Sequence, residues 1–418
     1  MKINKYRGPI LISLSPNTQK DDLLLAFKLL FKSPKNTCLE LEKKFKEYLE
    51  IKHAFTFNSG RTAFLAILKG LNIEKGEVML QAFTCNAVVN PIIKAGLKPV
   101  FVDIDKETLN MDIFDLEKKI SDQSKIVLVQ HTFGLPADLE RIQSICQKHN
   151  LILIEDCAHS LGAEYNGKKL GIFGKAAFFS FGRDKVISSV FGGLAATNDE
   201  NLARKIGEYR NKLTESSCFW TFQQLLHPIL NNFLVIPLYG FSGTGKWLLI
   251  FLQKIGLLSK AVKNEEKQGK MSDNFAKKMP NKLALLALNQ FNKLEKILKN
   301  QKEIASFYRE NIKNPDFTPL NQDSKRIYMR YSLLLKDKDT DKILKKARKQ
   351  KIFLDDGWRK TVIVPPDTNQ EKLGYQAGSC PKAEITAKEI LNLPTHINIS
   401  REEAKRITDF LNKNEYLF

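Results

Sequence analysis

A lysine and an aspartate each follow a short apolar segment of the chain. Lys185 comes shortly after Ala176–Phe181, and Asp156 comes directly after Leu151–Glu155. Burial beside cations lowers the pKa of a lysine and makes its amine nucleophilic, which suits covalent chemistry with an aldehyde. A carboxylate at the end of a buried strand needs a cation to offset its lost hydration. The alternatives are an ordinary exposed lysine and an aspartate that caps a helix.

Three weaker features accompany these two residues. Asn58–Ala63 is a glycine turn that opens a helix, and free amides at a helix start bind phosphate. His159 lies three residues after Asp156, and Ser180 lies near the end of the apolar segment before Lys185. None of these is specific alone, because many helices begin with such a turn and a histidine can simply lie on the surface.

The elements that must position these residues alternate between strands and helices. We expect strands at Glu77–Phe83, Pro99–Ile104, Lys125–Gln130, Leu151–Glu155, Ala176–Phe181 and Gly193–Thr197. Helices are expected near 61–70, 87–95, 112–120 and 138–149, after two at Asp21–Phe31 and Leu39–Leu49. Almost wholly apolar strands between helices predict an α/β fold with a mostly parallel sheet, whose ligands bind at the carboxyl ends of the strands.

The chain as a whole divides into four parts. We expect a large α/β domain over 1–212, an apolar helical insertion over 213–270, a long helical region over 271–313 and a small C-terminal α/β domain over 314–418. The last part should hold strands at Tyr328–Leu335 and Ile352–Leu354 and helices at 339–350, 384–391 and after Ser400, where Ser400 and Glu403 form a capping box.

Composition excludes several classes of protein. The chain has 418 residues, a formal net charge of +20 and six cysteines without a CxxC pair, so neither a disulfide scaffold nor a zinc ribbon organises it. We expect no metal site. Neither a signal peptide nor a membrane-spanning run is evident, which favours the cytoplasm. Residues 251–350 carry 24 basic and 11 acidic side chains, but no nucleic-acid motif, so no nucleic-acid partner is expected.

A phosphate-loop pattern, GxxxxGK, spans Gly240–Lys246. Trp247 follows it where such a loop needs serine or threonine to hold magnesium, and the segment lies outside any βαβ series. We therefore expect no nucleotide-hydrolysing site there.

Seven segments in a specific order and spacing carry a family resemblance. They read NSGRTAF, GEVMLQAFTCNAVVNPIIKAGLKPVFVDID, HTFGLPADLERI, IEDCAHSLGA, SFGRDK, PKAE and LNLPTHINIS. From about Leu39 to the C-terminus, outside 213–270, the chain resembles the DegT/DnrJ/EryC1/StrS family of sugar aminotransferases, which are pyridoxal-phosphate enzymes of the aspartate-aminotransferase fold. The resemblance implies a seven-stranded sheet, a homodimer with active sites at its interface, and amino transfer from an amino acid such as glutamate to a nucleotide-linked keto sugar.

The resemblance also assigns roles residue by residue. Lys185 stands at the Schiff-base lysine, and Asp156 stands where a carboxylate holds the cofactor's ring nitrogen protonated, so that the ring acts as an electron sink. His159 stands near the cofactor's ring oxygen. The phosphate would be bound by Ser180, by Gly60, Arg61 and Thr62 at the helix start, and by Lys278 of the partner subunit.

Two departures from the family pattern bear on the substrate. Cys85 stands where the family usually has an aromatic residue that stacks on the cofactor ring, so His159 or another group must cover that face. The family's sugar-binding pattern is hard to find in Val362–Tyr375. A non-catalytic or regulatory relative with the same fold is the alternative function, and Lys185 argues against it.

The insertion 213–270 has two competing explanations. It combines aromatic and aliphatic residues with flanking lysines at 246, 254, 260 and 263. The segment can pack on the dimer or close over the active site, or it can lie in a membrane interface with its lysines on anionic headgroups.

Overall fold

The computed structural model describes residues 8–241, 243–272, 275–320, 326–336 and 340–413. A central sheet has seven strands in the order β2-β11-β10-β7-β6-β3-β5, as expected from the family resemblance. Only β11 runs antiparallel to its two neighbours. The strands are β2 (His53–Phe57), β3 (Glu77–Gln81), β5 (Lys98–Val102), β6 (Ser124–Gln130), β7 (Ile152–Asp156), β10 (Ala176–Ser180) and β11 (Gly193–Thr197).

Strand β2 is the one strand of this sheet that the apolar pattern did not reveal. It lies at the edge of the sheet, and its burial alternates because His53 and Phe55 are only half-buried. An edge strand with one solvated face shows no continuous apolar run, so its sequence resembles a loop.

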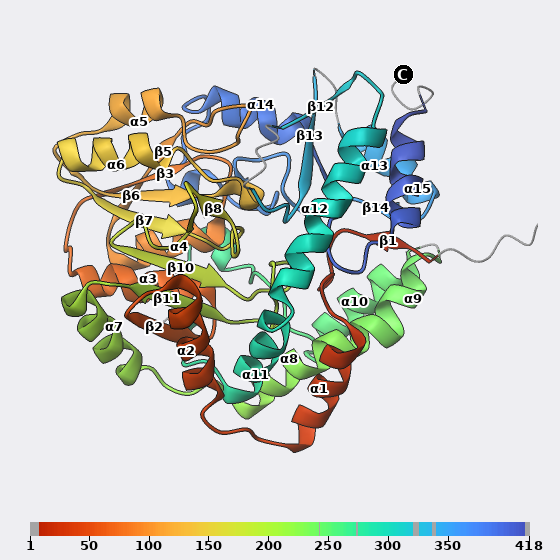
Figure 1. Ribbon diagram of the computed structural model, residues 1–418, viewed down its shortest axis with the longest axis horizontal. Coiled ribbons are helices and arrows are strands. Elements are labelled where there is room, and N and C mark those ends of the chain that lie inside the picture. The colour runs from red at the N-terminus through yellow and green to blue at the C-terminus, as the bar shows by residue number, and fades with distance from the viewer. Residues whose placement is uncertain (1–7, 242, 273–274, 321–325, 337–339, 414–418) are drawn as a thin grey trace, which may run out of the picture.

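Helices between the strands confirm the predicted alternation. They are α2 (Thr37–Leu49), α3 (Gly60–Leu71), α4 (Asn86–Ala95), α5 (Ile113–Lys119), α6 (Leu139–Lys148) and α7 (Glu200–Lys212). Figure 1 shows α5 and α6 near strands β5, β3 and β6, and α2 and α7 near the other end of the sheet. Ser59, Asp112, Asp138 and Asp199 cap α3, α5, α6 and α7 through their side chains.

The insertion is a run of short helices with a small core of its own. It contains α8 (Cys218–Leu230), a π-helix (Asn231–Val235), α9 (Ile236–Tyr239), α10 (Thr244–Lys254) and a 3-10 turn (Glu266–Gln268). Val235, Leu252 and Leu258 form its core. A helix, not a strand, precedes Gly240, so the GxxxxGK segment lacks the strand that a phosphate loop requires. Among the described helices, none is long and apolar enough to cross a membrane.

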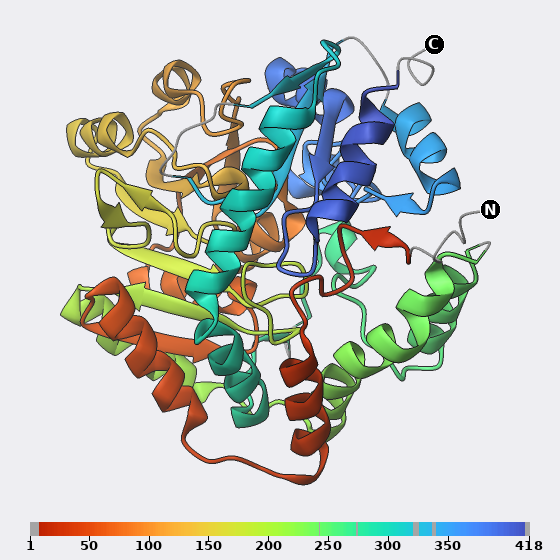
Figure 2. The same cartoon turned by 45° about the vertical axis from the view of Figure 1, so that its right-hand side comes forward.

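The expected long helical region is two helices, α11 (Asn281–Phe291) and α12 (Leu294–Asn311). The chain bends at Asn292 and Lys293, which lie between them. In both views α12 runs between the central sheet and the C-terminal elements (Figures 1 and 2).

The C-terminal unit is an antiparallel sheet, β12 (Phe317–Pro319), β13 (Tyr331–Leu335) and β16 (Ile390–Leu393), with helices α13 (Thr340–Lys349), α14 (Pro381–Glu389) and α15 (Arg401–Leu411). Ser400 and Glu403 form the predicted capping box of α15. The predicted helix over 384–391 is corrected at its end: α14 stops at Glu389, and Ile390 already pairs with Leu334 in the sheet.

The N-terminal segment joins this C-terminal unit, although it was expected to belong with the large domain. Strand β1 (Ile10–Leu11) pairs in parallel with β14 (Ile352–Phe353). Helix α1 (Lys20–Phe31) then leads back toward the large domain, where it contacts α8 and α11. Conversely, Ile363 and Cys380 lie in the C-terminal part of the sequence but pack into the core of the large domain.

Candidate active site

Three strands of the central sheet deliver polar side chains to one cavity. Gln130, Asp156 and Ser180 are the last residues of β6, β7 and β10, which run side by side in the sheet. All three line a cavity of about 280 Å³, together with Lys185. The site therefore lies at the carboxyl ends of parallel strands, as predicted.

Lys185 lies on the loop that follows β10, and the loop is held from a distant segment. The Asn17 side-chain amide donates to the carbonyl oxygens of Lys185 and Val186 at 2.9 and 3.0 Å. Burial lowers the pKa of Lys185, although the neighbouring Asp156 carboxylate opposes this shift. A lowered pKa leaves more of the amine unprotonated at neutral pH than in a free lysine.

Asp156 is 3% exposed and faces the cavity. Its Oδ1 accepts a hydrogen bond from the Ala158 amide at 2.9 Å, and the residues that follow form turns rather than a helix. Burial raises the pKa of this carboxyl, with Lys185 acting in the opposite direction. Asp156 therefore does not cap a helix. Its carboxylate faces the cavity, where it is close to the Lys185 amine and available to a cationic ligand group.

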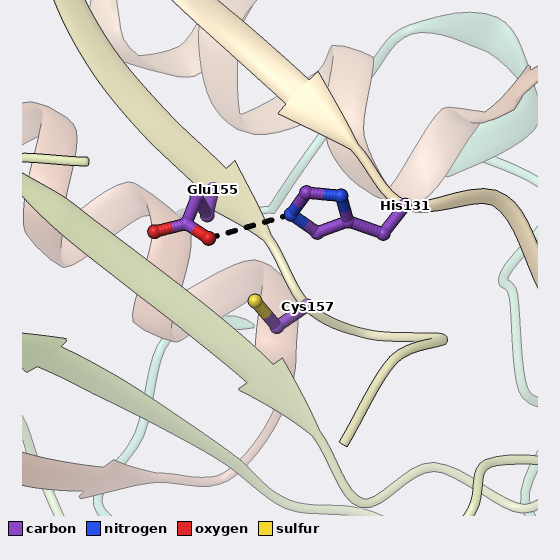
Figure 3. A group of neighbouring side chains, drawn as sticks. All are labelled: His131, Glu155 and Cys157. Carbon is purple, nitrogen blue, oxygen red and sulfur yellow. Dashed lines mark hydrogen bonds and ion pairs between the residues drawn. The ribbon is translucent and has the colours of Figure 1, made fainter. Parts of the chain in front are cut away.

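The neighbouring Glu155 has a structural role, and Figure 3 shows its carboxylate directed toward His131. Its carboxylate accepts the amides of Gly171, Phe173 and Gly174 at 2.7–2.8 Å and lies 3.4 Å from Nε2 of His131. His131 Nδ1 accepts the Ala137 amide, so its Nε2 carries the proton in the neutral ring.

Cys157 completes this group of three potential metal ligands. Burial raises the pKa of its thiol well above the ordinary value, so the sulfur stays protonated. Because the Glu155 oxygens are already occupied by amides, we interpret the group as the support that fixes the end of β7.

The start of helix α3 packs against the ends of β10 and β11 at glycines. A Cβ on Gly60 would lie 2.9 Å from Cβ of Ser180, and one on Gly193 would collide with the backbone of Gly60. Ser59 caps the helix by accepting the Thr62 amide at 3.3 Å. This close approach brings the helix start and the Ser180 hydroxyl to the same end of the cavity, as a phosphate site requires.

Thr62 and Arg61 are both engaged in contacts within the chain. The Thr62 hydroxyl donates to Asn58 Oδ1 at 2.6 Å, and Thr62 does not line the cavity. The Arg61 guanidinium pairs with Glu266 and donates to the carbonyl oxygen of Ala261 at 2.7 Å. Of the predicted phosphate contacts, therefore, Gly60, Arg61 and Ser180 line the cavity, and the Arg61 guanidinium is engaged by the insertion.

Arg61 and Arg183 hold a strap of the insertion, which we define as residues 259–269. The Arg183 guanidinium donates to the carbonyl oxygen and hydroxyl of Ser259 at 2.7 and 2.8 Å. The strap's other end reaches the 367–372 segment, where Lys267 pairs with Asp367. Ala261 and Val262 of the strap line the cavity, so the insertion contributes a wall of the site.

Aromatic residues cover the side of the cavity where His159 lies. The His159 ring stacks on Phe133 with centroids 5.4 Å apart, and meets the edge of Trp358 at 4.8 Å. Burial lowers the pKa of His159 well below its usual value, so the ring is neutral. Its Nδ1 is buried without a partner among the described residues. A ligand with a hydrogen-bonding group beside this ring would satisfy it.

The residues that sequence reasoning missed come from the C-terminal part of the chain. Asp356, Gly357 and Trp358 line the cavity, as do Val364 and Pro365. Strand β15 (Ile363–Val364) pairs in parallel with β4 (Thr84–Cys85), which places Val364 beside Cys85. Two-residue strands leave no periodic pattern, and only the tryptophan in an otherwise polar segment hinted at a special position.

Lys278 does not line this cavity. Its amine lies 3.3 Å from a Glu215 carboxylate oxygen, and its backbone amide donates to Thr214. That Lys278 binds the cofactor phosphate of a partner subunit remains a prediction.

The donor set fits pyridoxal phosphate. The cavity presents an amine with a lowered pKa, a buried carboxylate, an unpartnered imidazole nitrogen and a helix start that only glycine permits. These groups match an aldehyde, a protonated ring nitrogen, a ring oxygen and a phosphate. Fold and site together define an α/β enzyme of the kind that uses a lysine to react with an aldehyde cofactor.

The family model of the DegT/DnrJ/EryC1/StrS aminotransferases matches residues 30–225 and 249–412, and the chain belongs to this family. The chain is 28% identical over 385 residues to the GDP-perosamine synthase of Escherichia coli O157:H7, covering 90% of each chain. It is 27% identical to dTDP-3-amino-3,6-dideoxy-alpha-D-galactopyranose transaminase of Aneurinibacillus thermoaerophilus, again covering 90% of each.

Solved structures confirm the fold. The aminotransferase PseC of Helicobacter pylori, involved in pseudaminic acid biosynthesis, superimposes with a TM-score of 0.74 at 24% identity. The match covers 97% of this chain and 98% of that one.

Proposed function

We propose that this protein is a pyridoxal-phosphate-dependent aminotransferase that moves an amino group from glutamate to a keto sugar linked to a nucleotide. The observation that carries the proposal is the placement of Lys185, Asp156 and the start of α3 around one cavity. The names of the two curated relatives support a nucleotide-linked sugar as the acceptor. Such amino sugars serve glycan or surface polysaccharide biosynthesis.

The residues of the chain divide the work. Pyridoxal phosphate, when bound, supplies an aldehyde for the amine and a ring that withdraws electrons. The Ser180 hydroxyl and the amides at the start of α3 would hold its phosphate, and Asp156 would keep its ring nitrogen protonated. Lys185 Nζ would take a proton from the substrate carbon as a base and donate it, as an acid, to the carbon that was the cofactor's aldehyde carbon. Trp358 and Phe133 restrict water around His159.

The protein's assembly and location belong to the same proposal. We place the enzyme in the cytoplasm as a homodimer, with Lys278 of one subunit as a point charge for the cofactor phosphate of the other. The Lys278 amine is partly exposed and pairs with Glu215 at 3.3 Å, on the loop that leads into α11.

Borohydride reduction of the protein loaded with pyridoxal phosphate, followed by peptide mapping, tests the proposal. We expect the pyridoxyl label on Lys185 and no label in Lys185→Arg. A panel of nucleotide-linked keto sugars with glutamate should then yield an amino sugar with the wild type only. Label on another lysine, or a labelled protein that transfers no amino group to any acceptor, would contradict the proposal.

A further inference from the structure

Helices α9 and α10 and the π-helix of the insertion contact one another and expose large apolar side chains. Phe233 is 66% exposed, Trp247 70%, Phe251 56% and Ile255 56%. Leu234, Leu238, Phe241 and Ile250 are exposed as well. We call these eight residues the apolar apex. A soluble protein seldom leaves such a patch uncovered unless it is an interaction site.

Most of the apolar apex lies outside the residues that the family model matches. The family model leaves out residues 226–248, which hold five of its eight residues. The inner side of the same helices is already packed, through Val235, Leu252 and Leu258. The exposed side chains are thus not needed for the helices to fold onto the molecule.

The charge around the apolar apex is mainly positive. Between Glu215 and Glu265 the chain has no acidic residue and four lysines, at 246, 254, 260 and 263. Helix α13 and the residues after it add more positive charge, because 340–351 holds six basic residues and one acidic residue. Figure 2 shows the hairpin of α9 and α10 projecting from the same side of the molecule as strand β1.

Contacts join the basic helix to the apolar apex. The Lys351 amine lies over the Phe241 ring, 5.5 Å from its centroid, and Tyr239 meets Phe353 edge-on at 4.9 Å. Apolar and basic side chains therefore share one surface that includes α9, α10 and the end of α13.

We propose that this surface binds the protein peripherally to an anionic membrane. The apolar apex would insert into the headgroup region, and the basic residues would contact lipid phosphates. Aromatic and aliphatic side chains beside lysines are the pattern of an interfacial helix. Helix α10 has 11 residues and is about 16 Å long, far too short to span a bilayer. A second copy of the chain fits less well, because a two-fold contact would place lysines against lysines.

Flotation with vesicles tests the proposal on the full chain. Vesicles that contain about one third phosphatidylglycerol should carry the protein upward at low salt, and pure phosphatidylcholine vesicles should carry much less. Trp247→Asp should reduce the floated fraction at least tenfold. Phe114→Asp is the matched control, because Phe114 is 73% exposed on α5, far from the apolar apex, and its replacement should change nothing.

Tryptophan fluorescence gives a second readout. The chain has three tryptophans, and Trp220 and Trp358 are half-buried near the cavities. Anionic vesicles should shift the emission to the blue in the wild type and not in Trp247→Phe. Absence of flotation and of the blue shift would overturn the proposal. A loss of oligomeric mass in Trp247→Asp would also overturn it, since the apolar apex would then be a contact between copies.

Discussion

Glu155 and Asp156 are neighbours in β7, yet their carboxylates do opposite work. Successive side chains of a strand point to opposite faces, so one carboxylate meets the loop at 171–174 and the other meets the cavity. Glu155 is fully buried and accepts three amides, whereas Asp156 accepts one and faces Lys185. The surroundings of each carboxylate, rather than its residue type, give Glu155 a structural role and Asp156 a place in the active site.

Asp156→Asn should leave the fold intact and lower kcat for amino transfer by roughly 10²–10³-fold, because a neutral amide cannot stabilise a protonated ring nitrogen. Turnover with glutamate and a keto sugar measures the effect, and circular dichroism checks the fold. Turnover close to that of the wild type would show that the charge of Asp156 has no part in the reaction.

Glu155→Gln is the matched comparison for that substitution. The NH2 group of the glutamine would face backbone N–H donors that now bind a carboxylate oxygen. The free energy of unfolding should therefore fall by about 1–3 kcal/mol, measured by thermal unfolding. The kcat of the folded fraction should stay within a few-fold of the wild type. A kcat loss as large as that of Asp156→Asn, without a loss of stability, would contradict the division of roles.

At the scale of elements, the strap of residues 259–269 links three regions that are far apart in sequence. It is bound to Arg61 and Arg183 of the large domain, and the Asn90 amide donates to the carbonyl oxygen of Glu266 at 2.9 Å. The side chains of Arg61 and Glu266 are only 12% and 10% exposed. Each charge therefore offsets the free-energy cost of burying the other. The strap of the insertion therefore closes part of the active site, in agreement with the first of the two explanations for this segment.

Glu266→Gln should loosen the strap, because it leaves the partly buried Arg61 guanidinium without a counter-charge. Hydrogen–deuterium exchange of 259–269 should become at least tenfold faster than in the wild type. Glu265→Gln serves as the control, since the Glu265 side chain is exposed and its strap should exchange at the normal rate. Equal exchange in both variants would show that the pair does not hold the strap.

For the molecule as a whole, three buried histidines tie stability to pH. Burial lowers the pKa of His159 and His227 well below the usual value and that of His396 to about 3. The unfolded chain takes up protons on these rings below about pH 6.5, whereas the folded protein does not. Their contribution to stability is therefore complete above pH 6.5 and is lost as the pH falls.

The His396→Gln variant isolates one of these contributions. Denaturant unfolding between pH 6 and pH 5 should show a slope of free energy against pH that is smaller by about 1 kcal/mol per pH unit than in the wild type. The exposed His149 gives the control His149→Gln, whose slope should match the wild type. An unchanged slope in His396→Gln would mean that this ring is protonated in the folded protein.

Most strands and helices of the large domain, the positions of Asp156 and Ser180 at strand ends, and the position of Lys185 shortly after one were predictable from the sequence alone. Each depends on local information, because apolar periodicity marks an element and a polar residue after it marks its end. The family motifs added the cofactor and the expected roles of those residues, since the order of the motifs is specific.

Only the tertiary structure decided which distant residues complete the site. Arg61 and Glu266 are 205 residues apart, and Asn17 and Lys185 are 168 apart. Val364 reaches the cavity on the two-residue strand β15, and the two-residue strand β1 pairs with the C-terminal unit. Such contacts depend on how whole elements pack, and an arginine pairs with whichever carboxylate the packing brings within reach, so no local pattern could have named these partners.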